Sequence, residues 1–296
     1  MKHNTRIIFH IGLTKTGTTF LQKSVFPYLF SKYNYDSKSH SLHSFRKGLY
    51  LRGKTNFWSE EDSWMGGVDP KRFSYKRANF WKSINYLREK VSDIRLILVL
   101  RDQESWLKSL YLHDAKTKGR FGGLSLDQYA SLFENNYIYW SHHLDSLQDF
   151  KILLLNYEDL KNNQEKFIKA ICDFSDLSVK DNLVYKIVKN NKNESNQFVN
   201  ITPNSDIEMM ASRLFSKYEY QFSLINAAFR RINFKRQITR DLFIRLARQF
   251  PKKSSNVIEN LYLQDSQLKQ KFAQDWEETW KKAKSLPNVK TLDDFF

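Results

Sequence analysis

The chain has 296 residues, which is enough for one large domain or for a domain with a substantial helical extension. Hydrophobic residues make up 41% and aromatic residues 15%, which excludes a disordered chain, and nine Gly with five Pro argue against a loop-dominated all-β fold. The formal net charge of +16 predicts an anionic partner, whether nucleic acid, membrane surface, polyanionic glycan or nucleotide.

The compartment is indicated by cysteine usage and by the lack of apolar targeting segments. Cys172 is the single cysteine, so intramolecular disulfides are excluded and a reducing compartment is favoured. The first residues do not resemble a signal peptide, and no apolar stretch approaches the roughly 20 residues of a membrane-spanning helix. We therefore expect a cytoplasmic protein, with a peripheral position at the inner face of the membrane as an alternative.

Short β-rich runs alternate with helical patterns over residues 1–175. We expect strands over residues 6–11, near 56–58, over 94–100 and over 151–155. We expect helices over residues 18–26 with Pro27 as the stop, over 78–91, over 103–111, within 126–147 and over 160–174. The third and fourth strands are apolar on both faces, as in a parallel sheet that helices cover. The pattern predicts an α/β fold with a central, mainly parallel sheet.

The last third of the chain has a different pattern, because residues from about 205 to 284 are helical in character and only Pro251 interrupts them. We expect a core over residues 1–200 and a basic helical extension over residues 201–296, packed on the core. Residues 213–253 contain eleven Lys or Arg against two acids, so this stretch is expected to attract an anionic glycan or the bilayer. A solvated helix face is the simpler interpretation of such charges.

Residues 10–22, HIGLTKTGTTFLQ, carry the strongest functional signal in the sequence. A buried strand enters a turn that contains Gly12, Lys15 and Gly17, and a helix begins at the threonines that follow. This arrangement directs backbone N–H groups and a helix N-terminus at one point, which favours a bound anion. It is not a Walker A loop, because Lys15 precedes the second glycine and Thr18 stands where that motif has its lysine.

The pattern K-[TS]-G-T-T after a strand resembles the 5′-phosphosulfate loop of sulfotransferases that use 3′-phosphoadenosine 5′-phosphosulfate (PAPS), in the version of bacterial and Golgi-type carbohydrate sulfotransferases. The resemblance implies a P-loop-like three-layer fold and transfer of a sulfuryl group from PAPS to an acceptor hydroxyl, with 3′-phosphoadenosine 5′-phosphate (PAP) as product. It also implies which residues bind the 5′-phosphosulfate group: Lys15, Thr16, Gly17, Thr18 and Thr19.

A second segment, residues 98–111, resembles the family's 3′-phosphate site, in which an arginine ends a strand and a serine follows eight residues later. Arg101 and Ser109 have that spacing. A planar guanidinium can make a two-pronged contact with a phosphate, and a hydroxyl two helical turns later adds a donor. Asp102 departs from the neutral or basic residue that many relatives carry, and it either pairs with Arg101 or faces solvent.

A third segment, residues 156–161 with the sequence NYEDLK, also resembles a family motif. We expect it to be architectural, with Asp159 as a helix cap and Leu160 as a packing residue. Together the three segments extend the resemblance over about residues 6–175.

Sulfuryl transfer requires an aligned acceptor hydroxyl and neutralisation of the charge that grows on the leaving oxygen. Lys15 is the natural group for that charge, and no metal is expected because no cluster has ligand spacing. The family takes its general base from the segment between the two cosubstrate motifs. The candidates there are His40, His43, Glu60 and Glu61. His40 is the first choice and His43 the second, because histidine accepts protons near neutral pH.

The acceptor is expected to be a carbohydrate, such as a polysaccharide, a glycolipid or a lipid-linked glycan. Two other functions are alternatives. A nucleotide-dependent kinase would share the loop and the helix, but the Walker lysine and a Mg²⁺-binding acid after a strand are missing. A basic nucleic-acid-binding protein would explain the net charge, yet the sequence contains no recognisable recognition module, so nucleic acid is not an expected partner.

Overall fold

The computed structural model describes residues 3–31, 34–36, 55–59, 73–117, 124–133, 138–179, 181–194 and 262–296. The chain forms two compact units. The first contains residues 1–103, 135–197 and 271–296, and the second contains residues 104–134 and 198–270. A division into a core and a C-terminal extension at residue 200 stays a prediction, because residues 195–261 lie outside the described part.

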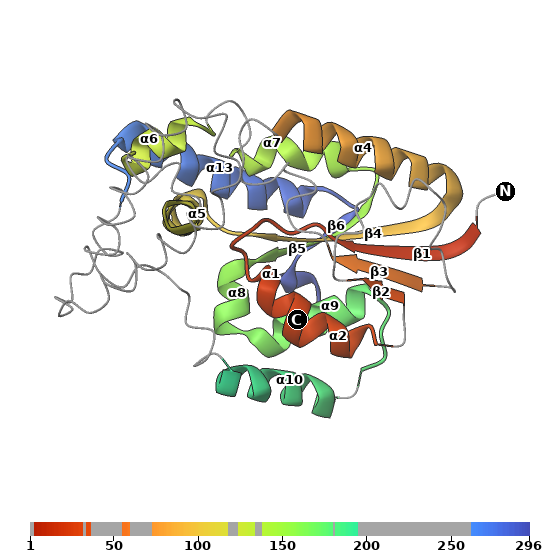
Figure 1. Cartoon of the computed structure of the whole chain (residues 1–296). Coiled ribbons are helices and arrows are strands. Elements are labelled where there is room, and N and C mark those ends of the chain that lie inside the picture. The colour runs from red at the N-terminus through yellow and green to blue at the C-terminus, as the bar shows by residue number, and fades with distance from the viewer. Residues whose placement is uncertain are drawn as a thin grey trace, which may run out of the picture. The chain divides into compact units, whose positions relative to one another are not determined.

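Within the described residues, the first unit is built on a six-stranded sheet in the order β2-β3-β1-β4-β5-β6 (Figure 1). The strands are β1 His3–His10, β2 Asn34–Asp36, β3 Thr55–Ser59, β4 Val91–Leu100, β5 Lys151–Asn156 and β6 Val289–Lys290. Every neighbouring pair is parallel, which confirms the predicted α/β fold. Sequence analysis misses β2 and β6 because runs of three and two residues carry no periodicity.

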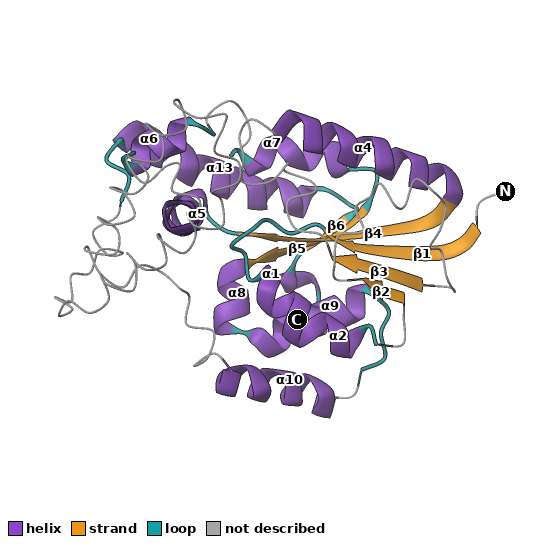
Figure 2. Cartoon of the chain, in the orientation of Figure 1, coloured by secondary structure: helices purple, strands orange, loops and turns teal. Residues whose placement is uncertain are grey.

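Helices cover both faces of this sheet, which gives a three-layer fold (Figure 2). One face carries α4 Phe73–Lys90, α7 Trp140–Leu144 and the part of α13 Ser266–Ser285 that belongs to the first unit. The other face carries α1 Thr18–Phe20, the π-helix η1 Leu21–Val25, α2 Phe26–Leu29, α8 Tyr157–Asn162, α9 Gln164–Phe174 and α10 Asp181–Glu194. Helix α5 Gln103–Thr117 begins at the last residue of the first unit's first segment and otherwise belongs to the second unit. Helix α6 Leu126–Ser131 belongs to the second unit.

The helix after β1 does not stop at Pro27, and this corrects the prediction from the sequence. Helices α1, η1 and α2 follow one another without a break, and Pro27 lies in the first turn of α2. Proline is compatible with a first helical turn because its ring fixes φ at a helical value. The π-helical turn over Leu21–Val25 comes directly before it, so the chain stays helical from residue 18 to residue 29.

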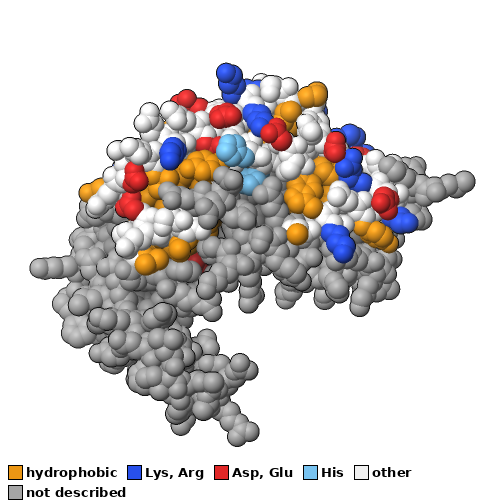
Figure 3. All heavy atoms as spheres, turned by 90° about the horizontal axis from the view of Figure 1, so that it is seen from above, with side chains coloured by type: hydrophobic (Ala, Val, Ile, Leu, Met, Phe, Trp, Pro, Cys, Tyr) orange, Lys and Arg blue, Asp and Glu red, His pale blue; other side chains and the backbone are white. Residues whose placement is uncertain are grey.

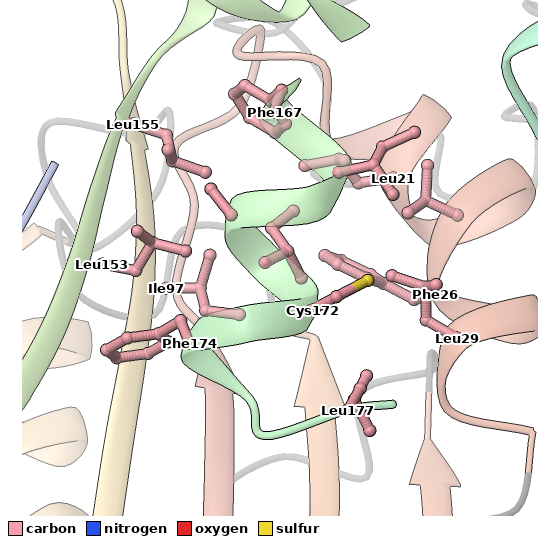
Figure 4. Packing of buried hydrophobic residues seen from close by; sticks show 14 of the residues in the cluster. Leu21, Phe26, Leu29, Ile97, Leu153, Leu155, Phe167, Cys172, Phe174 and Leu177 are labelled. Atoms are coloured by element: carbon pink, nitrogen blue, oxygen red, sulfur yellow. The ribbon is translucent and has the colours of Figure 1, made fainter. Parts of the chain in front are cut away.

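Both faces of the central strands are buried, as a parallel sheet requires. Alternate side chains of β4 and β5, among them Ile97 and Leu153, pack against α9 and α2 in one continuous cluster (Figure 4). Cys172 lies inside this cluster, and burial raises the pKa of its thiol to about 12. The cysteine is therefore an uncharged core residue.

An ion network joins the amino-terminal halves of three neighbouring strands. Arg6 on β1 lies 2.7 Å from Asp93 on β4, and Lys151 on β5 lies 3.2 Å from the same carboxylate. Arg95 lies 3.1 Å from Asp93 and 2.8 Å from Asp176. Burial alone would raise the pKa of Asp93, but hydrogen bonds from Arg95, Arg6 and Lys151 lower it to about 2.

Replacing Asp93 with Asn should destabilise the protein in a pH-dependent way. Because its folded pKa is depressed, the carboxylate contributes stability above its unfolded value of 3.8 and loses that contribution as the pH falls toward about 2. Solvent screens part of the network, so we expect Asp93→Asn to lower the free energy of unfolding by about 1 to 2 kcal/mol at neutral pH. Urea unfolding of both proteins along a pH series measures this difference. A difference that stays constant down to about pH 2 would contradict the prediction.

Candidate functional site

The predicted site residues of the first unit gather at the carboxyl ends of neighbouring strands. β1 ends at His10 and leads into the β1–α1 loop, defined as residues 11–17. Arg101 directly follows β4, and Tyr157 directly follows β5. Because β4 pairs in parallel with both β1 and β5, these three strand ends meet at one edge of the sheet. Open α/β sheets bind their ligands at this edge.

The β1–α1 loop holds two residues in the left-handed region of backbone space, Lys15 with a φ of 71° and Gly17 with a φ of 80°. Glycine adopts this conformation readily, whereas a lysine there is strained, and such strain is concentrated at functional sites. The Thr16 hydroxyl donates to the Leu13 carbonyl at 2.6 Å. The loop is thus held by a buried internal hydrogen bond, and the half-buried Lys15 lies at its strained point.

The helical segment that follows the loop begins with an N-terminus that has no side-chain cap. Gly17 is the N-cap residue, and its carbonyl accepts the first helical hydrogen bond, from the Leu21 N–H at 3.0 Å. A glycine offers no side chain to the N–H groups of the first turn, which starts with buried Thr18 and exposed Thr19. An uncapped helix start beside a lysine suits an anion.

Helix α8 packs beneath the loop. A Cβ atom at Gly17 would overlap Leu160 Cδ2 and would lie 3.3 Å from Tyr157 Cε2. The cap of α8 is Asn156 rather than the expected Asp159, because the Asn156 side chain accepts from the Glu158 N–H at 3.0 Å. Leu160 is buried, as expected for a packing residue. This segment fixes the position of the loop.

Arg101 is held on several sides at the end of β4. Its guanidinium carbon lies 4.7 Å from the centre of the Tyr157 ring, within the range of a cation–π contact. Its Nη1 donates a long hydrogen bond of 3.4 Å to the Lys15 carbonyl. Its own carbonyl accepts from Trp140 Nε1 at 3.0 Å. These contacts bring the two predicted cosubstrate-binding cations, Lys15 and Arg101, to the same edge of the sheet.

A buried carboxylate on α13 supports this strand end. Asp275 accepts from the Trp140 N–H at 2.7 Å and from the Ser141 N–H at 3.3 Å. It also accepts from the Ser141 hydroxyl and from Gln103 Nε2, each at 2.5 Å. Burial raises the pKa of Asp275, and the hydrogen bonds from Ser141 and Trp140 act in the opposite direction. Sequence reasoning missed this residue because Asp275 lies 172 residues from Gln103.

For the other predicted site residues, the structure does not determine where they lie relative to this group. Ser109 is half-buried in α5 and belongs to the second unit, whereas Arg101 belongs to the first. Their joint 3′-phosphate site therefore stays a prediction. The candidate general bases and the basic stretch lie outside the described residues: His40, His43, Glu60, Glu61 and 213–253.

Acidic and basic side chains are interspersed on the described part of the face that Figure 3 shows. Within the described ranges, no group of three or more His, Cys, Asp or Glu is arranged to hold a metal ion. None of the described helices combines the length and the apolar composition needed to cross a bilayer.

Comparison with known proteins matches one family model and a number of solved structures, among them two sulfotransferases. The family model of the sulfotransferase domain matches residues 6–220. Mouse sulfotransferase SULT7A1 complexed with PAP is 14% identical over 67% of this chain and 67% of its own, with a TM-score of 0.43. A sulfotransferase from Alicyclobacillus acidocaldarius is 11% identical over 58% of this chain and 81% of its own, with a TM-score of 0.37. Comparison with curated proteins gives no match.

Replacing Gly17 with Ala should destabilise the loop for two reasons. Alanine is strained at a φ of 80°, and its Cβ would overlap Leu160. Together these effects should lower the free energy of unfolding by about 2 to 4 kcal/mol, measured by urea denaturation. The control is the double variant with Leu160→Ala, which should lose less than the sum of the two single variants because the overlap is gone. Strictly additive losses would show that Leu160 does not press on the loop.

Proposed function

Because the chain belongs to the sulfotransferase domain family, we propose that it transfers a sulfuryl group from PAPS to a hydroxyl group of a carbohydrate acceptor. The observation that carries the proposal is the position of Lys15, in a strained loop beside an uncapped helix start, with Arg101 bonded to its carbonyl. PAPS carries negative charge at both its 5′ and its 3′ ends. Two cations at one sheet edge complement that distribution.

On the donor side, the 5′-phosphosulfate group is bound by the β1–α1 loop and the helix start. Lys15 provides the charge, and Gly17, Thr18 and Thr19 provide the backbone of the helix start. Thr16 contributes by holding the loop closed through its bond to the Leu13 carbonyl. Arg101 and Ser109 bind the 3′-phosphate in this proposal, and the ring of Tyr157 keeps the guanidinium in place.

In the transfer itself, the bond between sulfur and the bridging oxygen of the 5′-phosphate breaks while a bond to the acceptor oxygen forms. Lys15 neutralises the charge that grows on the leaving phosphate oxygen, so its contribution is largest in the transition state. The acceptor hydroxyl gives its proton to a general base, and PAP is the second product. His40 is the first candidate for this base, His43 is the second, and Glu60 or Glu61 comes next. The proposed mechanism uses no metal.

The acceptor side is proposed from charge and from family resemblance. A polysaccharide, a glycolipid or a lipid-linked glycan would meet the eleven Lys or Arg of residues 213–253, and the protein would work in the cytoplasm, free or peripheral at the inner face of the membrane. Family membership decides against the kinase and nucleic-acid-binding alternatives. A mass-spectrometric screen of such glycans with PAPS identifies the acceptor by its gain of a sulfuryl group.

Replacing Lys15 with Ala should lower kcat by about 10²- to 10³-fold while the KM for PAPS changes much less, because the lysine is proposed to meet charge that develops in the transition state. Release of PAP in the presence of an acceptor from the screen measures both constants. The matched control is Lys23→Ala, which removes an exposed lysine of η1 and should leave turnover unchanged. Normal turnover in Lys15→Ala would overturn the proposed mechanism.

Replacing Arg101 with Ala should remove the preference for a 3′-phosphate. We expect the unmodified protein to bind PAP at least about tenfold more tightly than adenosine 5′-phosphate, since a charged hydrogen-bonded pair is worth that much. Titration calorimetry with both nucleotides should show nearly equal affinities for Arg101→Ala and an intermediate preference for Ser109→Ala. Arg88→Ala, at an exposed arginine of α4, is the control. Equal affinities in the unmodified protein would contradict the role of Arg101.

A further inference from the structure

A fully buried histidine lies at the start of the β1–α1 loop and has no part in the mechanism above. His10 is the last residue of β1, and its ring lies 5.0 Å from the ring of Phe26. Its Nδ1 lies 2.7 Å from Ser59 Oγ, directly across the parallel pair of β1 and β3. Gln22 Nε2 donates to the same hydroxyl oxygen at 3.0 Å. In the sequence, His10 appears only as the first residue of the loop motif, so its hydrogen bonds to distant residues could not be predicted.

The hydrogen bonds of the His10 ring are compatible with both of its neutral tautomers. The Ser59 hydroxyl has one hydrogen and two lone pairs, so it can accept from Gln22 and either donate to His10 Nδ1 or accept from it. The ring is uncharged at physiological pH because burial lowers the pKa of His10 to about 3. A neutral ring whose Nδ1 accepts carries its hydrogen on Nε2.

The Nε2 atom lies against the loop and is without a hydrogen-bond partner among the described residues. A Cβ atom at Gly12 would lie 2.6 Å from His10 Nε2 and 2.9 Å from Thr18 Cγ2, so the ring edge and the Thr18 methyl group fill the space that a side chain at Gly12 would need. A buried N–H group without an acceptor is unfavourable, and such groups are usually satisfied by ordered water or by a ligand. With the ring hydrogen on Nε2, this buried atom is an unsatisfied donor next to the loop that is proposed to bind an anion, and only this tautomer offers the anion a hydrogen bond from the ring.

We propose that His10 is an uncharged binding residue of the β1–α1 loop, whose Nε2–H donates to an oxygen of the 5′-phosphate group of the cosubstrate. This inference rests on the proposed PAPS site and adds a residue to it. Ser59 and Gln22 act as positioning residues, because Ser59 bonds to the ring at Nδ1 and Gln22 bonds to Ser59. A neutral donor adds one hydrogen bond to the anion, and it does so without burying a second cation beside Lys15.

The first test observes the donor directly. In the full chain labelled with ¹⁵N-histidine, the ring signals of seven histidines are expected, and His10→Gln identifies the one from His10. We expect a neutral Nε2–H signal that shifts on addition of PAP but not on addition of adenosine 3′-phosphate, which lacks the 5′-phosphate. A His10 signal that is unchanged when PAP is bound overturns the inference and leaves the proposed function intact. Failure of the unmodified protein to bind PAP overturns both.

The second test uses two amides that replace different nitrogen atoms of the ring. The amide of His10→Gln reaches the position of Nε2, whereas the amide of His10→Asn reaches only that of Nδ1 and can still bond to Ser59. We expect His10→Gln to keep its affinity for PAP within about threefold and His10→Asn to lose about tenfold, since a hydrogen bond to a charged group is worth at least that factor. His142→Asn, at an exposed histidine of α7, is the matched control.

Urea unfolding of the same variants separates binding from stability. If His10 only fills space, affinity for PAP should follow stability and should not distinguish Gln from Asn. Equal affinities of the two variants would therefore overturn the inference. A loss confined to His10→Asn at comparable stability supports it, because a packing role predicts no such difference.

Discussion

Arg101 is fixed at both of its ends by different parts of the first unit, and the arrangement of the site depends on this. The indole of Trp140 binds its carbonyl, and the ring of Tyr157 lies under its guanidinium. The backbone N–H of Trp140 in turn donates a hydrogen bond to Asp275 on helix α13, near the C-terminus. A guanidinium that is already oriented loses less side-chain entropy when it binds a phosphate. The C-terminal helix therefore supports the site although it supplies none of the predicted ligand-binding residues.

The two edges of the sheet use charge for different purposes. Toward the amino ends of the strands, three cations surround Asp93 and Asp176, and these charges satisfy one another. At the carboxyl ends, the Tyr157 ring and the Lys15 carbonyl, which both contact the guanidinium of Arg101, are uncharged groups. An arginine that is oriented in this way suits the contact with a phosphate that we propose for it. In the proposed function, stability and binding therefore depend on opposite ends of the same strands.

The fold could be predicted from the sequence because its evidence is local. The apolar runs of β4 and β5 and the unbroken motif from His10 to Gln22 each lie within one short segment. The contacts that support the site join distant segments, and spacing within a segment does not encode them. Ser59 meets His10 across 49 residues, and Asp275 meets Gln103 across 172. The helix end at Pro27 was predicted wrongly because the tolerance of proline in a first turn depends on where that turn begins.

The loop is defined by packing as much as by the phosphate that it is proposed to bind. Two side chains lie close to the backbone of the loop at its glycines. His10 packs against Gly12, and Leu160 packs against Gly17. Any larger residue at either position would displace its neighbour, so both glycines are required for close approach, and Gly17 also for its positive φ. Lys15 adopts a positive φ without that freedom. A strained lysine persists only where the surrounding structure holds the backbone, and the close packing at the two glycines is part of that restraint.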